Sequence, residues 1–404
     1  MSVGARELTK IAGTLAALAI FVAGGCSSPP PEATAGATGS GATGSGSAGN
    51  SSSGGGSTGG GAITSPLRFD AGGDGAFGPV SIAVGGGEGE LFFSQATDAG
   101  SDYFLQHLTP SGIASQGWVS LGSGTPTSPP KVAVSSDGTE VTCCWEDYGG
   151  INGSNTMGEV IRCNTVPPRG TSPDFSLGGG FSDTGSKPSI AQGSSYTVVA
   201  YTEAQDEFMT ETILNLASPG SVSFQASFPI ADWHLAPSND LFNLFLGDGA
   251  TIDVSGQGPE LQNDGGLSPV GVASTGSFAL ATSSGMTAAP STVLLTHQGS
   301  QVVAAIFGPS VPPSAAISAA GETPVDPLAA AMCNENTFGL AYGLSGGKVA
   351  FRTIDLTASV GAERVIATGF DSDVIGIGMA AVDGGVLIAA GTPTAISVFA
   401  VPCS

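Results

Sequence analysis

Residues 327–367 read PLAAAMCNENTFGLAYGLSGGKVAFRTIDLTASVGAERVIA, and this stretch contains one full copy of the unit that decides the fold. It divides into two apolar runs, a run of mixed polarity and a short polar run, at Pro327–Ala331, Thr337–Tyr342, Val349–Asp355 and Arg364–Ala367. Short runs separated by glycine, serine and asparagine are typical of antiparallel strands joined by hairpins. The stretch therefore predicts a four-stranded β-sheet.

The same order of strands recurs over residues 64–404. Apolar first strands, rich in small and β-branched residues, are expected at Val80–Val84, Lys131–Val134, Pro188–Ala191, Trp233–Ala236, Pro269–Ala273, Pro327–Ala331 and Ile375–Met379. In a β-propeller, small residues pack around the central channel and the outermost strand of each blade faces solvent. The gradient from apolar to polar strands therefore indicates a propeller. Seven units give about 49 residues each, within the roughly 40–50 residues of known blades.

Units four and five are less regular than the others. We assign the fourth strand of unit four to Glu260–Asn263, and the second, third and fourth strands of unit five to Ser277–Thr282, Val293–His297 and Val302–Phe307. The Ala- and Ser-rich segment Pro312–Pro324 is expected to form a loop or one short helix. Six blades, or a sandwich of many strands, stay open as alternatives.

The last unit ends after three strands, and the segment Ser65–Asp70 precedes the first unit. Pairing this segment with the last blade closes the ring and removes an open sheet edge. We therefore predict that residues 63–404 form an all-β domain, a seven-bladed β-propeller closed by an N-terminal strand.

The order of strands, turns and closing aromatic residues is similar to the repeats of exported bacterial propellers. It is seen at Phe104–Gly112 and Val349–Gly361, and in Trp145 and Tyr201, which end second strands. The resemblance covers nearly the whole of the predicted domain. It implies a β-propeller domain of unassigned function.

The N-terminus has the pattern of a cleaved export signal. Arg6 and Lys10 precede the apolar stretch Ile11–Ala23, which is too short for a permanent membrane span. Ala23-Gly-Gly-Cys26 resembles the lipobox of bacterial lipoproteins, although that family prefers Leu where Ala23 stands. The resemblance implies a signal peptide at residues 1–25 and a lipid anchor on Cys26. An ordinary secretory signal with an incidental cysteine is the alternative.

The residue after the lipidated cysteine is Ser27 rather than Asp. In lipoproteins of Gram-negative bacteria this implies an outer-membrane lipoprotein of the cell envelope, on either side of that membrane. Residues 26–62 are almost entirely Gly, Ser, Ala, Thr and Pro, so they predict a disordered tether. Its typical reach is roughly 30–36 Å.

The net charge of −23 argues against two classes of partner. Binding to nucleic acid or to an anionic lipid surface requires clustered Lys and Arg, and the chain has only 10 of them. We therefore expect no nucleic-acid partner, and contact with the membrane only through the lipid anchor.

A search for catalytic motifs predicts no catalytic residue. His107, His234 and His297 lack the spacing of a zinc site, and the two that end predicted third strands, His107 and His297, are expected to be exposed. Gly343–Gly347 matches G-x-S-x-G, but it joins two strands of a hairpin rather than a strand and a helix.

Acidic loops give the candidates for binding. Calcium takes several carboxylate and carbonyl oxygens, and its candidate ligands are Asp70, Asp74, Asp371 and Asp373, although neither pair forms a complete calcium loop. No other cofactor is expected. The candidate ligand face comprises Trp145, Asp147, Tyr148 and Asp206.

Five cysteines follow Cys26, in a compartment that permits disulfides. Cys143 and Cys144 lie on one predicted strand and Cys163 on the next, so only one of the two neighbours can face Cys163, and the candidate pair is Cys144 with Cys163. Cys333 and Cys403 are a second candidate pair that would hold the C-terminus.

Three hypotheses for function follow. The first is a membrane-tethered interaction module that presents a propeller face to a protein, glycan or envelope ligand. The second is a secreted, glycan-acting enzyme with its site at the channel mouth, and the third is a structural envelope protein.

Overall fold

The computed structural model describes residues 67–71, 75–98, 100–114, 118–124, 130–134, 141–150, 157–166, 175–177, 186–192, 197–203, 208–214, 220–225, 231–238, 241–257, 268–283, 291–307 and 314–404. All of them belong to one compact unit, Gly46–Ser404. The predicted signal peptide, Cys26 and the tether lie outside the described residues. No helix in the described part of the chain is long and apolar enough to cross a membrane.

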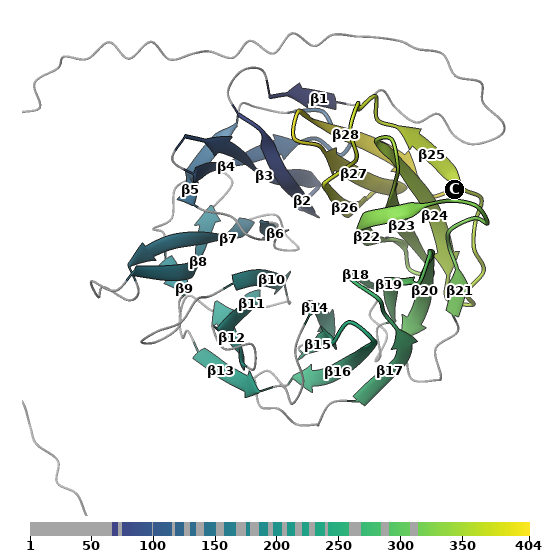
Figure 1. Ribbon diagram of the computed structural model, residues 1–404, viewed down its shortest axis with the longest axis horizontal. Helices are drawn as coiled ribbons and strands as arrows, with labels where there is room; N and C mark the ends of the chain where they lie inside the picture. The colour runs from purple at the N-terminus through teal and green to yellow at the C-terminus, as the bar shows by residue number, and fades with distance from the viewer. Residues whose placement is uncertain are drawn as a thin grey trace, which may run out of the picture. The chain divides into compact units, whose positions relative to one another are not determined.

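These residues form seven four-stranded antiparallel sheets (Figure 1). The first sheet contains β2 (Phe77–Gly85), β3 (Glu88–Thr97), β4 (Gly100–Leu108) and β5 (Val119–Gly124). The second contains β6 (Lys131–Val134), β7 (Val141–Gly150), β8 (Met157–Val166) and β9 (Phe175–Leu177). The third contains β10 (Ser186–Gln192), β11 (Thr197–Glu203), β12 (Phe208–Leu214) and β13 (Gly220–Gln225).

The remaining sheets follow the same order. The fourth contains β14 (Asp232–Ser238), β15 (Leu241–Gly247), β16 (Thr251–Gln257) and β17 (Ser268–Ala273). The fifth contains β18 (Phe278–Thr282), β19 (Thr292–Gln298), β20 (Gln301–Phe307) and β21 (Ser314–Ala316). The sixth contains β22 (Pro324–Asn334), β23 (Thr337–Leu344), β24 (Lys348–Asp355) and β25 (Arg364–Ala367). The last joins β26 (Gly376–Val382), β27 (Gly385–Gly391) and β28 (Ala395–Pro402) to β1 (Leu67–Asp70).

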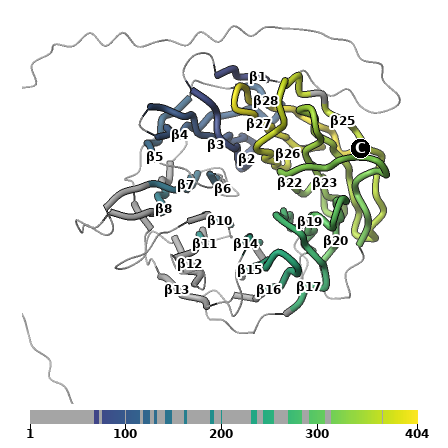
Figure 2. Tube along the Cα trace, in the orientation of Figure 1, coloured from purple at the N-terminus to yellow at the C-terminus, as the bar shows by residue number. Residues whose placement is uncertain are grey.

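The first strands of the sheets line the middle of the ring. Each contacts the first strand of the next sheet, from β2 through β6, β10, β14, β18 and β22 to β26, and β26 contacts β2. Figure 2 shows β22, β26 and β2 at the inner ends of their sheets. Gly376 and Gly378 allow this last contact, because a Cβ on either would lie within 3.0 Å of the β2 backbone. These two small residues of β26 therefore set how closely the last sheet meets the first.

The ring is closed by the N-terminal strand. β1 pairs antiparallel with β28, with Leu67 opposite Val398 and Phe69 opposite Ile396. Leu67 and Phe69 also pack on the apolar cluster between the last sheet and the first. The predicted pairing of Ser65–Asp70 with the last unit is thus present, over Leu67–Asp70.

The prediction for unit five is wrong by one strand. Pro269–Ala273 lies in β17, the fourth strand of the fourth sheet, and not in a first strand. Val270 and Val272 made it look like an inner strand, but they are buried because they pack between the fourth and fifth sheets. The true first strand is β18, and Pro312–Pro324 contains the fourth strand β21 rather than only a loop or a helix. The predicted strand Glu260–Asn263 lies outside the described residues.

Both predicted disulfides are present. Cys144 and Cys163 lie directly opposite each other on β7 and β8 and form one of them. The other joins Cys333, near the end of β22, to Cys403, which follows β28. Cys143 remains a buried thiol, and burial raises its pKa, with a further contribution from the nearby charge of Glu90.

Glu90 and His107 form a buried pair on the first sheet. They lie opposite each other on β3 and β4, with Glu90 Oε1 2.7 Å from His107 Nδ1. Both side chains are 3% exposed. His107 is therefore buried, and the prediction that it is exposed is wrong, because its ring pairs with the buried carboxyl group of Glu90.

Candidate functional site

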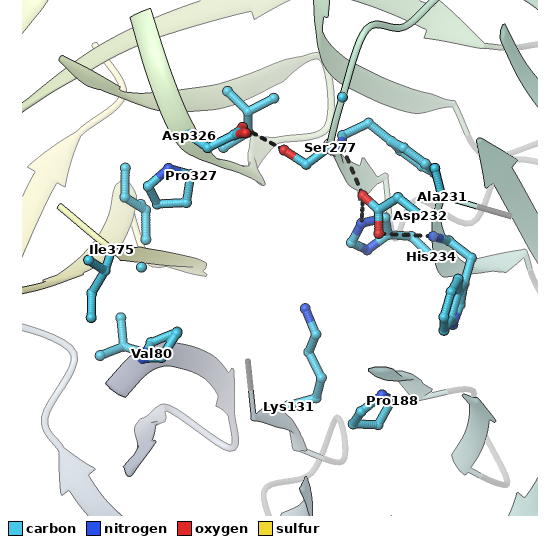
Figure 3. Close-up of a pocket in the computed structure, with 17 residues that line it drawn as sticks. Val80, Lys131, Pro188, Ala231, Asp232, His234, Ser277, Asp326, Pro327 and Ile375 are labelled. Carbon is cyan, nitrogen blue, oxygen red and sulfur yellow. Dashed lines mark hydrogen bonds and ion pairs between the residues drawn. The ribbon is translucent and has the colours of Figure 1, made fainter. Parts of the chain in front are cut away.

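A cavity of about 520 Å³ lies where the first strands of the sheets begin, and we call it the channel-mouth pocket. Its lining comes from all seven first strands or the residues just before them. Figure 3 shows its polar side chains on two sides, with Lys131 facing Asp232, Ser277 and Asp326.

One wall of the pocket is apolar. Pro79, Val80, Pro327 and Ile375 line it, and Ile375 is 39% exposed. Proline suits the start of a strand because it offers no N–H to the ladder and restricts the backbone there. The pocket therefore combines a stiff apolar wall with a few polar groups, as small-ligand sites usually do.

Asp232, the first residue of β14, is in contact with three groups. Its Oδ1 accepts a hydrogen bond from its neighbour Trp233 N at 2.9 Å, and its Oδ2 accepts one from Phe278 N at 3.1 Å and lies 3.3 Å from His234 Nε2. Desolvation raises the pKa of Asp232, but His234, the Phe278 N–H and the charge of Lys131 together lower it below its ordinary value. Asp232 is therefore an ionised carboxylate that also joins the fourth sheet to the fifth.

Asp326 lies at the start of the sixth sheet and makes a similar cluster. Its Oδ1 accepts a hydrogen bond from Ser277 Oγ at 2.5 Å and lies 3.1 Å from His297 Nε2. The bonds from His297 and Ser277 lower the pKa of Asp326, and they outweigh its desolvation and the charge of Asp232. Its side chain is 59% exposed, so Asp326 is the carboxylate more open to a ligand.

Lys131, the first residue of β6, is the basic residue of the pocket. It is half-buried, and within the described part of the chain its ammonium group has no hydrogen bond or ion pair. Desolvation lowers the pKa of Lys131, while the charge of Asp232 across the pocket opposes that shift. Its three N–H donors are therefore free for a ligand.

Ser277, His297 and Asp326 do not have the arrangement of a catalytic triad. A serine nucleophile requires a base that takes its proton, with a third group behind the base. Here the Ser277 hydroxyl donates to Asp326, and His297 contacts the same Asp326 oxygen, so the carboxylate lies between the serine and the histidine. Ser277 is therefore not activated by His297.

The structure does not support the ligand face predicted around Trp145. Trp145 is 2% exposed and stacks on Tyr103 between the first and second sheets, so that part of the prediction is wrong. Asp147 forms an ion pair with Arg162. Asp206 and the Tyr148 side chain lie outside the described residues.

The predicted calcium ligands are not brought together. Asp70 pairs with Arg68 at 2.8 Å, and Asp373 accepts a hydrogen bond from Gly346 N at 2.7 Å. Asp371 is exposed, and Asp74 lies outside the described residues. Across the part of the chain that the structure describes, no group of three or more His, Cys, Asp or Glu side chains is arranged to hold a metal.

Sequence reasoning missed the polar residues of the channel mouth. Lys131 and Asp232 are the first residues of β6 and β14, Ser277 directly precedes β18, and Asp326 is the third residue of β22. The signal that would have found them is a polar residue near the start of several first strands. Equivalent positions of the blades lie together around the channel, so these residues are expected to meet. His234 and His297 have no such signal, since each is placed by its aspartate partner.

No family model matches this chain, and no curated protein matches it. Among solved structures, one similar chain is part of a structure described as "Crystal Structure of Mitotic Checkpoint Complex". The TM-score is 0.52 and the identity 8%, and the alignment covers 84% of this chain and 96% of that one. At this identity the similarity shows the fold alone. The described part of the chain is therefore an all-β domain of four-stranded antiparallel sheets, with a propeller-like fold similar to that of the matched chain.

Proposed function

We propose that this chain is a lipid-anchored binding module of the cell envelope, whose seven-bladed propeller presents the channel-mouth pocket to a ligand. The observation that carries the proposal is the set of unsatisfied groups in this pocket. Within the residues that the structure describes, the Lys131 ammonium group has no hydrogen bond or ion pair, and Asp326 is 59% exposed on the facing side. Polar groups beside a rigid apolar wall favour binding, because side chains that are already fixed lose little conformational entropy when a ligand binds.

The rigidity of the pocket supports the same function. Its polar side chains are fixed by contacts between sheets, such as Asp232 to Phe278 N and Ser277 to Asp326. Leu235 N also donates to Ser189 Oγ at 3.1 Å, which joins β14 to β10. The wall of the pocket is therefore part of the ring itself, and its shape is set before a ligand arrives.

We expect the protein to sediment with isolated envelope polymers, either peptidoglycan or outer-membrane polysaccharide. Replacing Lys131 by Met should lower the bound fraction at least fivefold, because it removes the free donors and keeps most of the side-chain volume. Lys348→Met is the matched control, since Lys348 is an exposed lysine on β24 away from the pocket, and it should bind like the wild type. Unchanged binding by Lys131→Met would contradict the proposal, and failure of both polymers to bind would exclude an envelope polymer as the ligand. Release of soluble fragments would indicate an enzyme instead.

The anchor is tested separately. Replacing Cys26 by Ala should abolish incorporation of a palmitate analogue and move the protein from the membrane pellet to the soluble fraction, because the thiol that carries the lipid is removed. Labelling in cells followed by fractionation measures both effects. Ser27→Ala is the control that keeps the thiol and should remain labelled. Equal labelling of Cys26→Ala and wild type is the result that excludes the anchor.

A further inference from the structure

We infer that the channel-mouth pocket binds a small zwitterion, whose carboxylate pairs with Lys131 and whose ammonium group pairs with Asp326. This inference rests on the proposed function and adds the chemical class of the ligand. It is carried by two opposite charges that face each other across one cavity and do not pair with each other (Figure 3).

Lys131 specifies the anionic end of the ligand. Its ammonium group has no hydrogen bond or ion pair within the described part of the chain, and its environment removes water from it. A partly desolvated cation without a partner gains most from an anion that brings acceptor oxygens. A carboxylate has the size and the acceptors to take several of its N–H groups.

Asp326 specifies the cationic end. Its Oδ1 is occupied by Ser277 and His297, whereas Oδ2 has no hydrogen bond from the described residues. Asp232 is more enclosed, with 26% of its side chain exposed, and both of its oxygens already accept hydrogen bonds. Asp326 is therefore the direct acceptor for an ammonium group, and Asp232 adds negative potential beside it.

The charge of the whole protein favours a neutral ligand over an anion. The protein has a net charge of −23 and so repels anions in general. A ligand whose only charged group is a carboxylate is therefore repelled as it approaches the pocket. A zwitterion has no net charge and contacts both the cation and the carboxylate. The volume of about 520 Å³ accommodates a small molecule, and the walls of Val80, Pro327 and Ile375 suit a short hydrocarbon chain between its charged ends.

The test is a series of ω-amino acids measured by isothermal titration calorimetry on the full processed protein. The probes are 4-aminobutyrate, 5-aminopentanoate and 6-aminohexanoate, with hexanoate and hexylamine as singly charged controls. We expect one zwitterion of the series to bind at least tenfold more tightly than either control, because only it pairs at both ends. If hexanoate binds as tightly as the best zwitterion, the pocket is an anion site. If hexylamine does so, it is a cation site. Either result overturns the inference.

Two variants test the two ends independently. Lys131→Met should weaken the best zwitterion at least tenfold and remove the difference between it and hexylamine. Asp326→Asn should also weaken it at least tenfold and remove the difference between it and hexanoate, while Lys348→Met should bind like the wild type. Circular dichroism shows whether each variant folds, and if one does not, the other still decides the inference.

The result separates this inference from the proposed function. If an envelope polymer binds through Lys131 but none of the zwitterions binds, the ligand class is wrong and the binding module stands. If neither polymers nor probes bind, or if Lys131→Met changes nothing in either assay, both are wrong.

Discussion

Replacing Cys333 and Cys403 together by Ala is expected to lower the free energy of unfolding by about 4 kcal/mol. The disulfide joins residues 70 apart in the chain, and a crosslink that closes a loop of this length removes about 4 kcal/mol of chain entropy from the unfolded state. It also joins the last sheet, which β1 must close, to the sheet before it. Equilibrium unfolding in urea, monitored by tryptophan fluorescence, measures the change.

The shorter disulfide is the matched comparison. Cys144 and Cys163 are 19 residues apart, so the same entropy argument gives about 3 kcal/mol for their double replacement by Ala. The free energy of unfolding of the reduced wild type should be lower than that of either double variant, since the reduced protein lacks both crosslinks. An unchanged unfolding midpoint for Cys333→Ala/Cys403→Ala would show that this disulfide does not restrain the ring.

Removing the titratable carboxyl group of Glu90 is expected to flatten the dependence of stability on pH. Desolvation raises the pKa of Glu90 from 4.5 to about 7, although the pair with His107 opposes the shift. The folded state then holds a proton that the unfolded state has released, so stability is greatest below pH 4.5 and falls as pH rises toward 7. As pH rises from 5 to 7.5, this group should lower the free energy of unfolding of the wild type by about 2 kcal/mol.

Urea unfolding of the wild type and of Glu90→Gln at pH 5, 6 and 7.5 measures this effect. The amide keeps the shape of the side chain and its contact with His107 but has no charge to desolvate, so the variant should lose about 2 kcal/mol less over this range. Glu335→Gln replaces an exposed carboxylate in the β22–β23 turn and should follow the wild type. Parallel pH profiles for wild type and Glu90→Gln are the result that excludes a buried titrating carboxyl here.

The pattern of apolar and polar residues predicted a sheet correctly where the apolar character of each strand reflected its place in the blade. The unit at residues 327–367 reads as four strands, and the structure has β22 to β25 there. Unit five failed because Val270 and Val272 give an outer strand the pattern of an inner one. Burial between two blades and burial around the channel both favour apolar residues such as valine. Only the position of the next sheet shows which kind of burial a strand has.

The sequence by itself determined the four-stranded repeat outside unit five, the strand that closes the ring and the candidate cysteine pairs, since each depends on alternation or on neighbouring strands. Only the tertiary structure decided which side chains meet at the channel mouth. Lys131, Asp232 and Asp326 come from the second, fourth and sixth sheets. Their proximity depends on how many sheets form the ring and how closely the first strands approach, which are properties of the closed ring and not of any one stretch of chain.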